Sequence, residues 1–129
     1  MALAWFFADE RSDATEAVFE KTDDHTLFVP VHWYIEVTNG MLVGERRKRV
    51  EPAESLQFAE TLSGLRIEID FLDAPHYLRR ILPLARAHAL TAYDALYLEL
   101  AMRRALPLAT LDSALAKAAQ AVGVTVLGR

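Results

Sequence analysis

The sequence predicts a three-layer α/β/α domain in which helices cover both faces of a mostly parallel sheet. Short apolar segments rich in branched residues, typical of buried strands, alternate with longer segments whose apolar residues recur at helical spacing. Glycine and proline fall mostly at the boundaries between these segments. The length of 129 residues fits one domain, so we expect a single domain over residues 1–129.

The first half of the chain is predicted to hold three helices and two strands. Trp33, Val37 and Met41 recur at helical spacing, with Gly44 on the same face, and indicate a helix with one side in the core. The predicted elements are a helix over 2–21, a strand over 27–31, a helix over 32–46, a helix from Pro52 to Gly64 and a strand over 66–69.

The second half is predicted to hold helices and two strands in alternation. Asp73 is expected to cap a helix that reaches His88, and Pro83 within it predicts a kink or an end. The elements that follow are a helix from Thr91 to Arg104, a strand over 107–110, a helix over 112–122 that ends at Gly123, and a strand over 124–127.

Composition excludes several classes of site. There is no cysteine, so the chain has no disulfide, no thiolate metal ligand and no cysteine nucleophile, which suits the cytoplasm. The four histidines lack the spacing of a zinc site, and no glycine-rich phosphate loop is present. The net charge of −4 excludes a globally basic nucleic-acid binder. The basic runs 46–49 and 79–80 are the segments that could bind phosphate groups. The run 46–49 also fits a structural role, in which its positive charges stabilise the negative C-terminal end of the helix dipole.

Two acidic side chains follow predicted strands, where ligands bind to parallel sheets. Glu36 comes soon after the strand over 27–31, and Asp112 comes directly after the strand over 107–110. Asp94 stands three residues after Thr91 at the start of a predicted helix. Each has a purely structural alternative, since Asp94 fits a capping box, Asp112 fits an N-cap, and Glu36 fits a solvated helix edge.

Four short motifs, which follow one another along the chain as in the family, resemble the PIN-domain family. The resemblance is in particular to the VapC-type ribonuclease toxins of VapBC toxin–antitoxin systems. Glu36-Val-Thr-Asn39 is similar to the family's Glu-x-x-Asn element, and Thr-Ala-Tyr-Asp94-Ala-Leu is similar to its most recognisable stretch. Thr110-Leu-Asp112 resembles the Thr-x-Asp element at the next strand end. The segment Ala-Leu-Ala-Trp over 2–5 resembles the family's first helix.

The resemblance implies a cluster of carboxylates that binds Mg²⁺ or Mn²⁺ and hydrolyses RNA. Glu36, Asp94 and Asp112 would be the catalytic acids and metal ligands, Asp94 most directly, with Asn39 and Thr110 supporting them by hydrogen bonds. Carboxylates brought this close repel one another unless a cation neutralises them, and Mg²⁺ prefers such oxygen ligands. The cation would activate water and stabilise charge on the scissile phosphate.

One departure from the family pattern concerns the beginning of the sequence. The family starts with a hydrophobic strand that ends in an aspartate, another metal ligand, and alignment on residues 2–5 puts both before Met1. We expect either that the natural chain starts upstream or that this PIN domain is truncated and lacks its usual first central strand. In the second case, metal affinity and turnover would be weakened.

The resemblance leads to a principal function and two alternatives. The principal one is a cytoplasmic, metal-dependent endoribonuclease toxin that forms homodimers, is neutralised by a VapB-type antitoxin and does not associate with a membrane. The second is a catalytically impaired PIN module that mainly binds an antitoxin or acts in regulation. The third is an unrelated metal-dependent phosphoesterase acting on DNA or a small phosphate. Aromatic side chains suited to partner contacts, or equally to the core, are Trp5, Phe6, Phe7, Trp33 and Tyr34.

Overall fold

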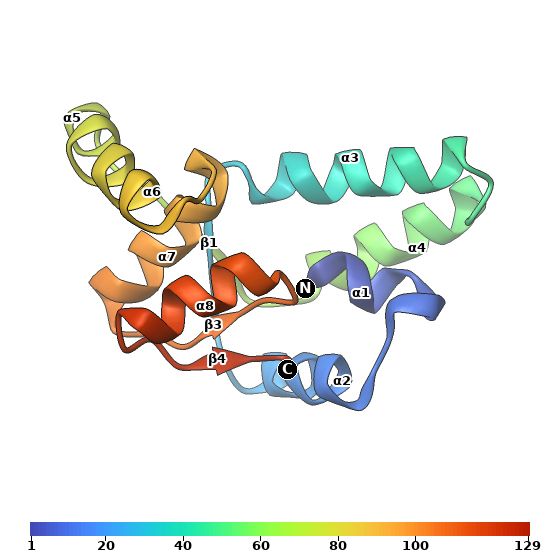
Figure 1. Cartoon of the computed structure of the whole chain (residues 1–129). Coiled ribbons are helices and arrows are strands. Elements are labelled where there is room, and N and C mark those ends of the chain that lie inside the picture. Colours follow the sequence, from blue (N-terminus) through green and yellow to red (C-terminus); the bar gives the residue numbers. More distant parts are fainter. The chain divides into compact units, whose positions relative to one another are not determined.

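The computed structural model describes all of residues 1–129 and is rich in helices, with four short strands (Figure 1). None of the helices combines the length and the apolar character that a membrane span requires. The helices and strands are α1 (Ala2–Phe6), α2 (Asp13–Glu20), β1 (Leu27–Pro30), α3 (Trp33–Arg46), α4 (Pro52–Ser63), β2 (Ile67–Asp70), α5 (Ala74–His76), α6 (Leu82–His88), α7 (Ala92–Arg104), β3 (Leu108–Ala109), α8 (Ser113–Ala121) and β4 (Val126–Leu127). Short 3₁₀ turns over Ala8–Glu10 and Lys21–Asp23 and a π-helix over Tyr77–Ile81 complete the helical content.

The strands confirm the α/β class predicted from the sequence. β1 pairs with β2, and β3 pairs with β4 in parallel, with Leu108 opposite Val126 and Ala109 opposite Leu127. The four strands therefore form two separate pairs, and no strand joins the pairs into one sheet. β3 and β4 contain two residues each, so hydrogen bonds at their ends, such as Leu108 N to Thr125 O at 2.8 Å, supply much of the pairing.

The chain divides into two compact units, and each is described by itself. Unit 1 consists of Met1–Phe28 and His32–Glu68, and unit 2 consists of Val29–Val31 and Ile69–Arg129. The single domain expected over residues 1–129 stays a prediction.

In unit 1, the helix predicted over 2–21 is wrong, because the chain forms two helices there. α1 ends at Phe6, and α2 begins at Asp13 after the extended residue Ser12. Ser12 caps α2, since its hydroxyl accepts a hydrogen bond from the Thr15 N–H at 3.3 Å while the Thr15 hydroxyl accepts one from the Ser12 N–H at 2.9 Å. Arg11 donates to the Trp5 carbonyl at 2.9 and 3.1 Å, which satisfies an oxygen at the open end of α1.

Two glycines of α3 allow α1 to pack closely against it. A Cβ atom at Gly44 would lie 2.7 Å from the Phe7 ring, and one at Gly40 would lie 2.4 Å from Leu3. The Arg49 guanidinium lies 3.8 Å from the centre of the Phe7 ring, a cation–π contact. The side chains predicted for the inner face of α3 are accordingly buried or partly buried.

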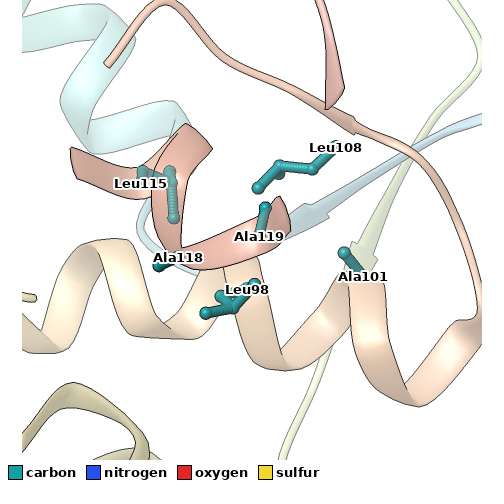
Figure 2. Close-up of a cluster of buried hydrophobic side chains, with 6 residues drawn as sticks. All are labelled: Leu98, Ala101, Leu108, Leu115, Ala118 and Ala119. Atoms are coloured by element: carbon teal, nitrogen blue, oxygen red, sulfur yellow. The ribbon is translucent and has the colours of Figure 1, made fainter. Parts of the chain in front are cut away.

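The core of unit 2 lies where α7 and α8 pack beside β3 (Figure 2). Leu98 is the most deeply buried of its three leucines and has no exposed surface. Small residues, chiefly alanines, let the helices approach closely around this leucine. The buried members of the cluster are Leu98, Ala101, Leu108, Leu115, Ala118 and Ala119.

The segment around Pro83 continues as helix, although the sequence predicted a kink or an end there. Proline has no N–H to donate to the carbonyl one turn earlier, and the preceding turn, Tyr77–Ile81, widens into a π-helix before α6. Asp73 occupies the N-cap position of α5 as predicted, but its side chain makes no capping bond. The Asp73 carboxylate contacts the His76 ring instead.

Candidate active site

Asp94 lies in the first turn of α7, in unit 2. Its N–H donates to the Thr91 hydroxyl at 3.1 Å, and that hydroxyl donates to Asp94 Oδ2 at 2.7 Å. Thr91 is therefore the N-cap of α7, as a capping box requires, but the Asp94 carboxylate binds the Thr91 hydroxyl and not its backbone N–H, so the predicted box is only half formed. The cap uses only one of the two carboxylate oxygens, and the side chain is half-buried, so the arrangement leaves Oδ1 for a further ligand.

Asp112 is the N-cap of α8 and follows β3 by a short turn. Its Oδ1 accepts a hydrogen bond from the Leu115 N–H at 2.7 Å, which confirms the N-cap interpretation. The Asp112 N–H donates to the hydroxyl of the buried Thr110 at 3.1 Å. Thr110 thus fixes the backbone of Asp112. Asp112 is an exposed residue, and its second carboxylate oxygen, Oδ2, takes no part in the cap.

Glu36 lies in the first turn of α3, in unit 1, and its side chain is 46% exposed. His32 at the N-cap lies one turn earlier, and its Nε2 is 3.6 Å from Glu36 Oε2. Burial lowers the pKa of the Met1 amino group, and the charges of Glu10 and Glu36 act against that shift. Asn39, one turn further along α3, is exposed.

The five predicted site residues are divided between the two units. Glu36 and Asn39 belong to unit 1, whereas Asp94, Thr110 and Asp112 belong to unit 2. No three His, Asp or Glu side chains lie close enough together to hold a metal ion. The local geometry thus supports a capping role for Asp112 and a contact of Asp94 with the capping residue Thr91, while the metal-binding roles of the acids stay predictions.

A buried ion network in unit 2 was missed by sequence reasoning. Asp70 at the end of β2 and Glu99 in α7 are 6% and 5% exposed, and arginine side chains surround both. Arg103 binds both acids, with its Nε 2.9 Å from Glu99 Oε1, and Arg104 Nε lies 2.6 Å from Asp70 Oδ1. Arg80 from the π-helix completes the network at 3.3 Å from Glu99. The i, i+4 spacing of Glu99 and Arg103 was the one sequence feature that pointed to it.

The acids and arginines of this network shift each other's pKa values. Burial opposes ionisation of Asp70, but hydrogen bonds from Arg103 and Arg104 outweigh it, and the pKa of Asp70 lies below its ordinary value. Hydrogen bonds to Asp70 and Glu99 raise the pKa of Arg103 above its ordinary value. A carboxylate already held by two guanidinium groups is a poor ligand for a cation, so we assign Asp70 to the structure and not to catalysis.

The basic run 46–49 has a structural role at one of its residues. Arg49 donates to both oxygens of Asp9, at 2.9 and 3.0 Å, and to Glu10 at 2.9 Å, which ties the 3₁₀ turn after α1 to the end of α3. These hydrogen bonds raise the pKa of Arg49. Arg46 lies in the last turn of α3, where a positive charge complements the helix dipole.

Most of the aromatic side chains considered for partner contacts belong to the core. Trp5, Phe6, Phe7 and Trp33 are at most 9% exposed, whereas Tyr34 is 42% exposed. Unit 1 nevertheless has a groove of about 490 Å³ that is lined by aromatic, acidic and other polar side chains. Its lining includes Trp5, Phe6, Arg11, Glu16, Phe19, Glu20, Glu54 and Phe58.

The fold and these acids define the class of the protein as an α/β domain with acidic side chains in the first turns of α3 and α7 and at the N-cap of α8. The family model of the PIN domain matches residues 1–121 of the chain. The chain therefore belongs to the PIN domain family, whose members are generally metal-dependent nucleases. No curated protein matches the sequence.

Proposed function

We propose that this PIN domain is a metal-dependent endoribonuclease that hydrolyses phosphodiester bonds in RNA with Mg²⁺ or Mn²⁺. The observation that carries the proposal is the family match over residues 1–121, together with the family-type acids Asp94 and Asp112 at the starts of α7 and α8. Membership of the PIN domain family supports nuclease chemistry. The RNA substrate is proposed from the resemblance of the motifs to those of VapC-type toxins.

The donor set fits a hard divalent cation. Glu36, Asp94 and Asp112 offer carboxylate oxygens, the ligands that Mg²⁺ prefers alongside water. In both aspartates, one oxygen is engaged in a local cap and the other remains. When bound, the cation lowers the pKa of water and stabilises negative charge on the scissile phosphate.

The chain's own residues would orient these ligands. The Thr91 hydroxyl restricts rotation of the Asp94 carboxylate, and the Leu115 N–H does the same for Asp112. Thr110 holds the backbone of Asp112 by a hydrogen bond. Asn39, in the same helix as Glu36, would support Glu36 by a further hydrogen bond. Such fixed positions matter because a ligand misplaced by about 1 Å can cost roughly a hundredfold in rate.

We further propose that the protein is a toxin, acts in the cytoplasm as a homodimer and is held inactive by a VapB-type antitoxin. The groove of unit 1 supports an antitoxin contact, because its lining combines aromatic side chains with three glutamates, against one arginine. A segment with apolar side chains and flanking arginines or lysines would complement both features. Titration of the chain with a peptide of this composition, followed by calorimetry, tests this contact.

The second candidate is a catalytically impaired PIN module that mainly binds a partner. It is favoured by the local hydrogen bonds of Asp94 and Asp112, which already engage one carboxylate oxygen of each aspartate at a helix start. Thermal unfolding with and without Mn²⁺ separates the candidates. An intact site would raise the melting temperature with increasing Mn²⁺, since a ligand that binds the folded state stabilises it.

The experiment that tests the proposed activity compares cleavage of RNA and single-stranded DNA of the same sequence, with Mg²⁺ or Mn²⁺ and with excess EDTA. The proposal predicts cleavage of RNA that stops when EDTA removes the cation. Cleavage of DNA or of a small phosphate ester in preference to RNA would favour an unrelated phosphoesterase. Cleavage that persists in EDTA would contradict metal dependence.

A further inference from the structure

Unit 2 is basic, whereas unit 1 is strongly acidic. Unit 1 contains 13 Asp and Glu against 7 Lys and Arg, a net charge of −6, and unit 2 contains 5 against 7, a net charge of +2. The overall charge of −4 is therefore the sum of an acidic unit and a basic unit. A polyanion such as RNA is attracted to a local positive surface even where the whole chain is negative.

Three arginines of unit 2 follow one another along the π-helix and α6. Arg79 and Arg80 lie in the π-helix, and Arg86 lies in α6, about two helical turns or roughly 10 Å further along the axis. All three are exposed residues, and neither Arg79 nor Arg86 takes part in an ion pair. These two guanidinium groups therefore keep their charge and their N–H donors for a ligand.

An ion network joins the π-helix to an exposed aromatic side chain. Arg80 and Arg103 both bind Glu99, at 3.3 and 2.9 Å. Arg103 also binds Asp70, which is the last residue of β2, and Phe71 follows it. Phe71 is 74% exposed, although a phenylalanine is usually buried. This ring therefore lies beside a network whose arginines are partly open to solvent.

Guanidinium groups together with an exposed aromatic ring are typical of surfaces that bind single-stranded nucleic acid. Arginine binds phosphate oxygens by charge-assisted hydrogen bonds. A base can stack on a protein ring where it is not already stacked in a duplex, so the ring of Phe71 indicates a single strand. The same unit contains Asp94 and Asp112 of the proposed cleavage site, which favours RNA over an acidic protein segment as the ligand.

We propose that Arg79 and Arg86 bind phosphates of a single-stranded RNA substrate and that Phe71 stacks on one of its bases. This inference rests on the proposed function, in which the substrate is RNA. It assigns binding of the strand to a surface that contains none of the acids proposed for metal binding. Strand binding and cleavage therefore depend on separate side chains and can be measured separately.

The test is fluorescence anisotropy of a labelled single-stranded RNA of mixed sequence, added to the full chain in excess EDTA so that the RNA stays intact. We expect the double variant Arg79→Gln/Arg86→Gln to bind about tenfold more weakly than the unchanged protein near 0.15 M salt. Its plot of log affinity against log salt concentration should be shallower by about 1.4, because each phosphate contact on a single strand contributes about 0.7.

The matched control for the arginines is the double variant Arg46→Gln/Arg47→Gln. It removes the same number of charges from exposed arginines, but in the acidic unit. The control should leave the RNA affinity and its salt dependence nearly unchanged. All four arginines are exposed, so we expect both double variants to fold, which far-ultraviolet circular dichroism checks.

Phe71 gives a second, independent readout. We expect Phe71→Ala to weaken RNA binding by about fivefold or more while the salt dependence stays the same, because stacking on a ring neutralises no phosphate. Leu56→Ala is the control, since Leu56 is an apolar residue of unit 1 that is 66% exposed. It should bind RNA as the unchanged protein does.

The possible failures are distinguishable. No loss in Arg79→Gln/Arg86→Gln, or a loss equal to that of its control, would overturn this surface and leave the ribonuclease proposal standing. Binding of polyglutamate in place of RNA, lost in the same variant, would identify a protein-binding surface instead. The expected binding without cleavage after addition of Mg²⁺ or Mn²⁺ would support the surface and contradict the proposed catalysis. An unchanged protein that binds no RNA in EDTA overturns the inference, and the cleavage assay then decides the proposed function alone.

Discussion

Asp70→Asn is expected to cost about 2–3 kcal/mol of folding free energy at neutral pH. The Asp70 side chain is 4% exposed and accepts hydrogen bonds from Arg103 and Arg104. Removing one partner of a fully buried ion pair costs about 3–5 kcal/mol. The two arginines are 27% and 38% exposed, so water can solvate them after the change, which reduces the expected cost to roughly 2–3 kcal/mol.

The pH dependence of this effect has a definite sign. Because the pKa of Asp70 is lower in the fold than in the unfolded chain, its contribution is fully present above the unfolded value of about 3.9. The contribution is lost as the pH falls through the lower, folded pKa. The stability gap between the unchanged protein and Asp70→Asn should therefore shrink in acid below about pH 4.

Urea unfolding followed by far-ultraviolet circular dichroism measures both quantities. Asp73→Asn serves as the control, because Asp73 is 63% exposed and pairs with His76 on the surface of the same unit. The control should change the stability by less than about 1 kcal/mol. A loss below 1 kcal/mol for Asp70→Asn at pH 7, or a gap that stays constant down to pH 3, would refute the reasoning.

Two further substitutions, one in each unit, probe packing by the same unfolding measurement. Gly44→Ala places a Cβ atom 2.7 Å from the Phe7 ring and should destabilise the protein by about 1–2 kcal/mol despite the higher helix propensity of alanine. Gly64→Ala, where the nearest atom is 3.4 Å away, should be nearly neutral, and equal effects at the two glycines would contradict the close packing. Leu98→Ala removes a side chain with no exposed surface and should cost about 2–5 kcal/mol, whereas Met102→Ala, 44% exposed on the same helix, should cost less than 1 kcal/mol. Similar losses at both positions would contradict the assignment of the unit 2 core.

Local patterns predicted most of the elements. The stripe of Trp33, Val37 and Met41 predicted α3 within one residue, because a helix with one buried side has a period that local sequence reveals. Pro52 and Thr91 marked the starts of α4 and α7 for equally local reasons.

The errors arose where a non-local contact or a weak local signal decided the structure. The break between α1 and α2 depends on the cap formed by Ser12 and on Arg11, which reaches back to Trp5, and the apolar spacing obscured both. Asp70 and Arg103 are 33 residues apart, so no local pattern revealed their ion pair. The pairing of the strands likewise depends on partners distant in sequence.

For the candidate site, the sequence predicted the environments of two acids correctly. Thr91 caps α7 and binds the Asp94 carboxylate through its hydroxyl, and Asp112 caps α8. Capping is a local interaction, so neighbouring residues suffice to predict it. Metal binding requires side chains from several elements to converge around an ion, and the roles of Glu36, Asp94 and Asp112 in it rest on the family.

The most direct test of the central claim is metal-dependent cleavage of a mixed RNA pool by the unchanged chain and by Asp94→Asn. Asparagine keeps an oxygen that can accept the hydrogen bond from Thr91, so the helix cap is retained while the charge is lost. Asp13→Asn, an exposed acid in the first turn of α2, is the matched control. The account predicts cleavage with Mg²⁺ or Mn²⁺ by the unchanged protein and by the control, and none by Asp94→Asn. Equal cleavage by Asp94→Asn, or no cleavage by any of the three proteins, would contradict it.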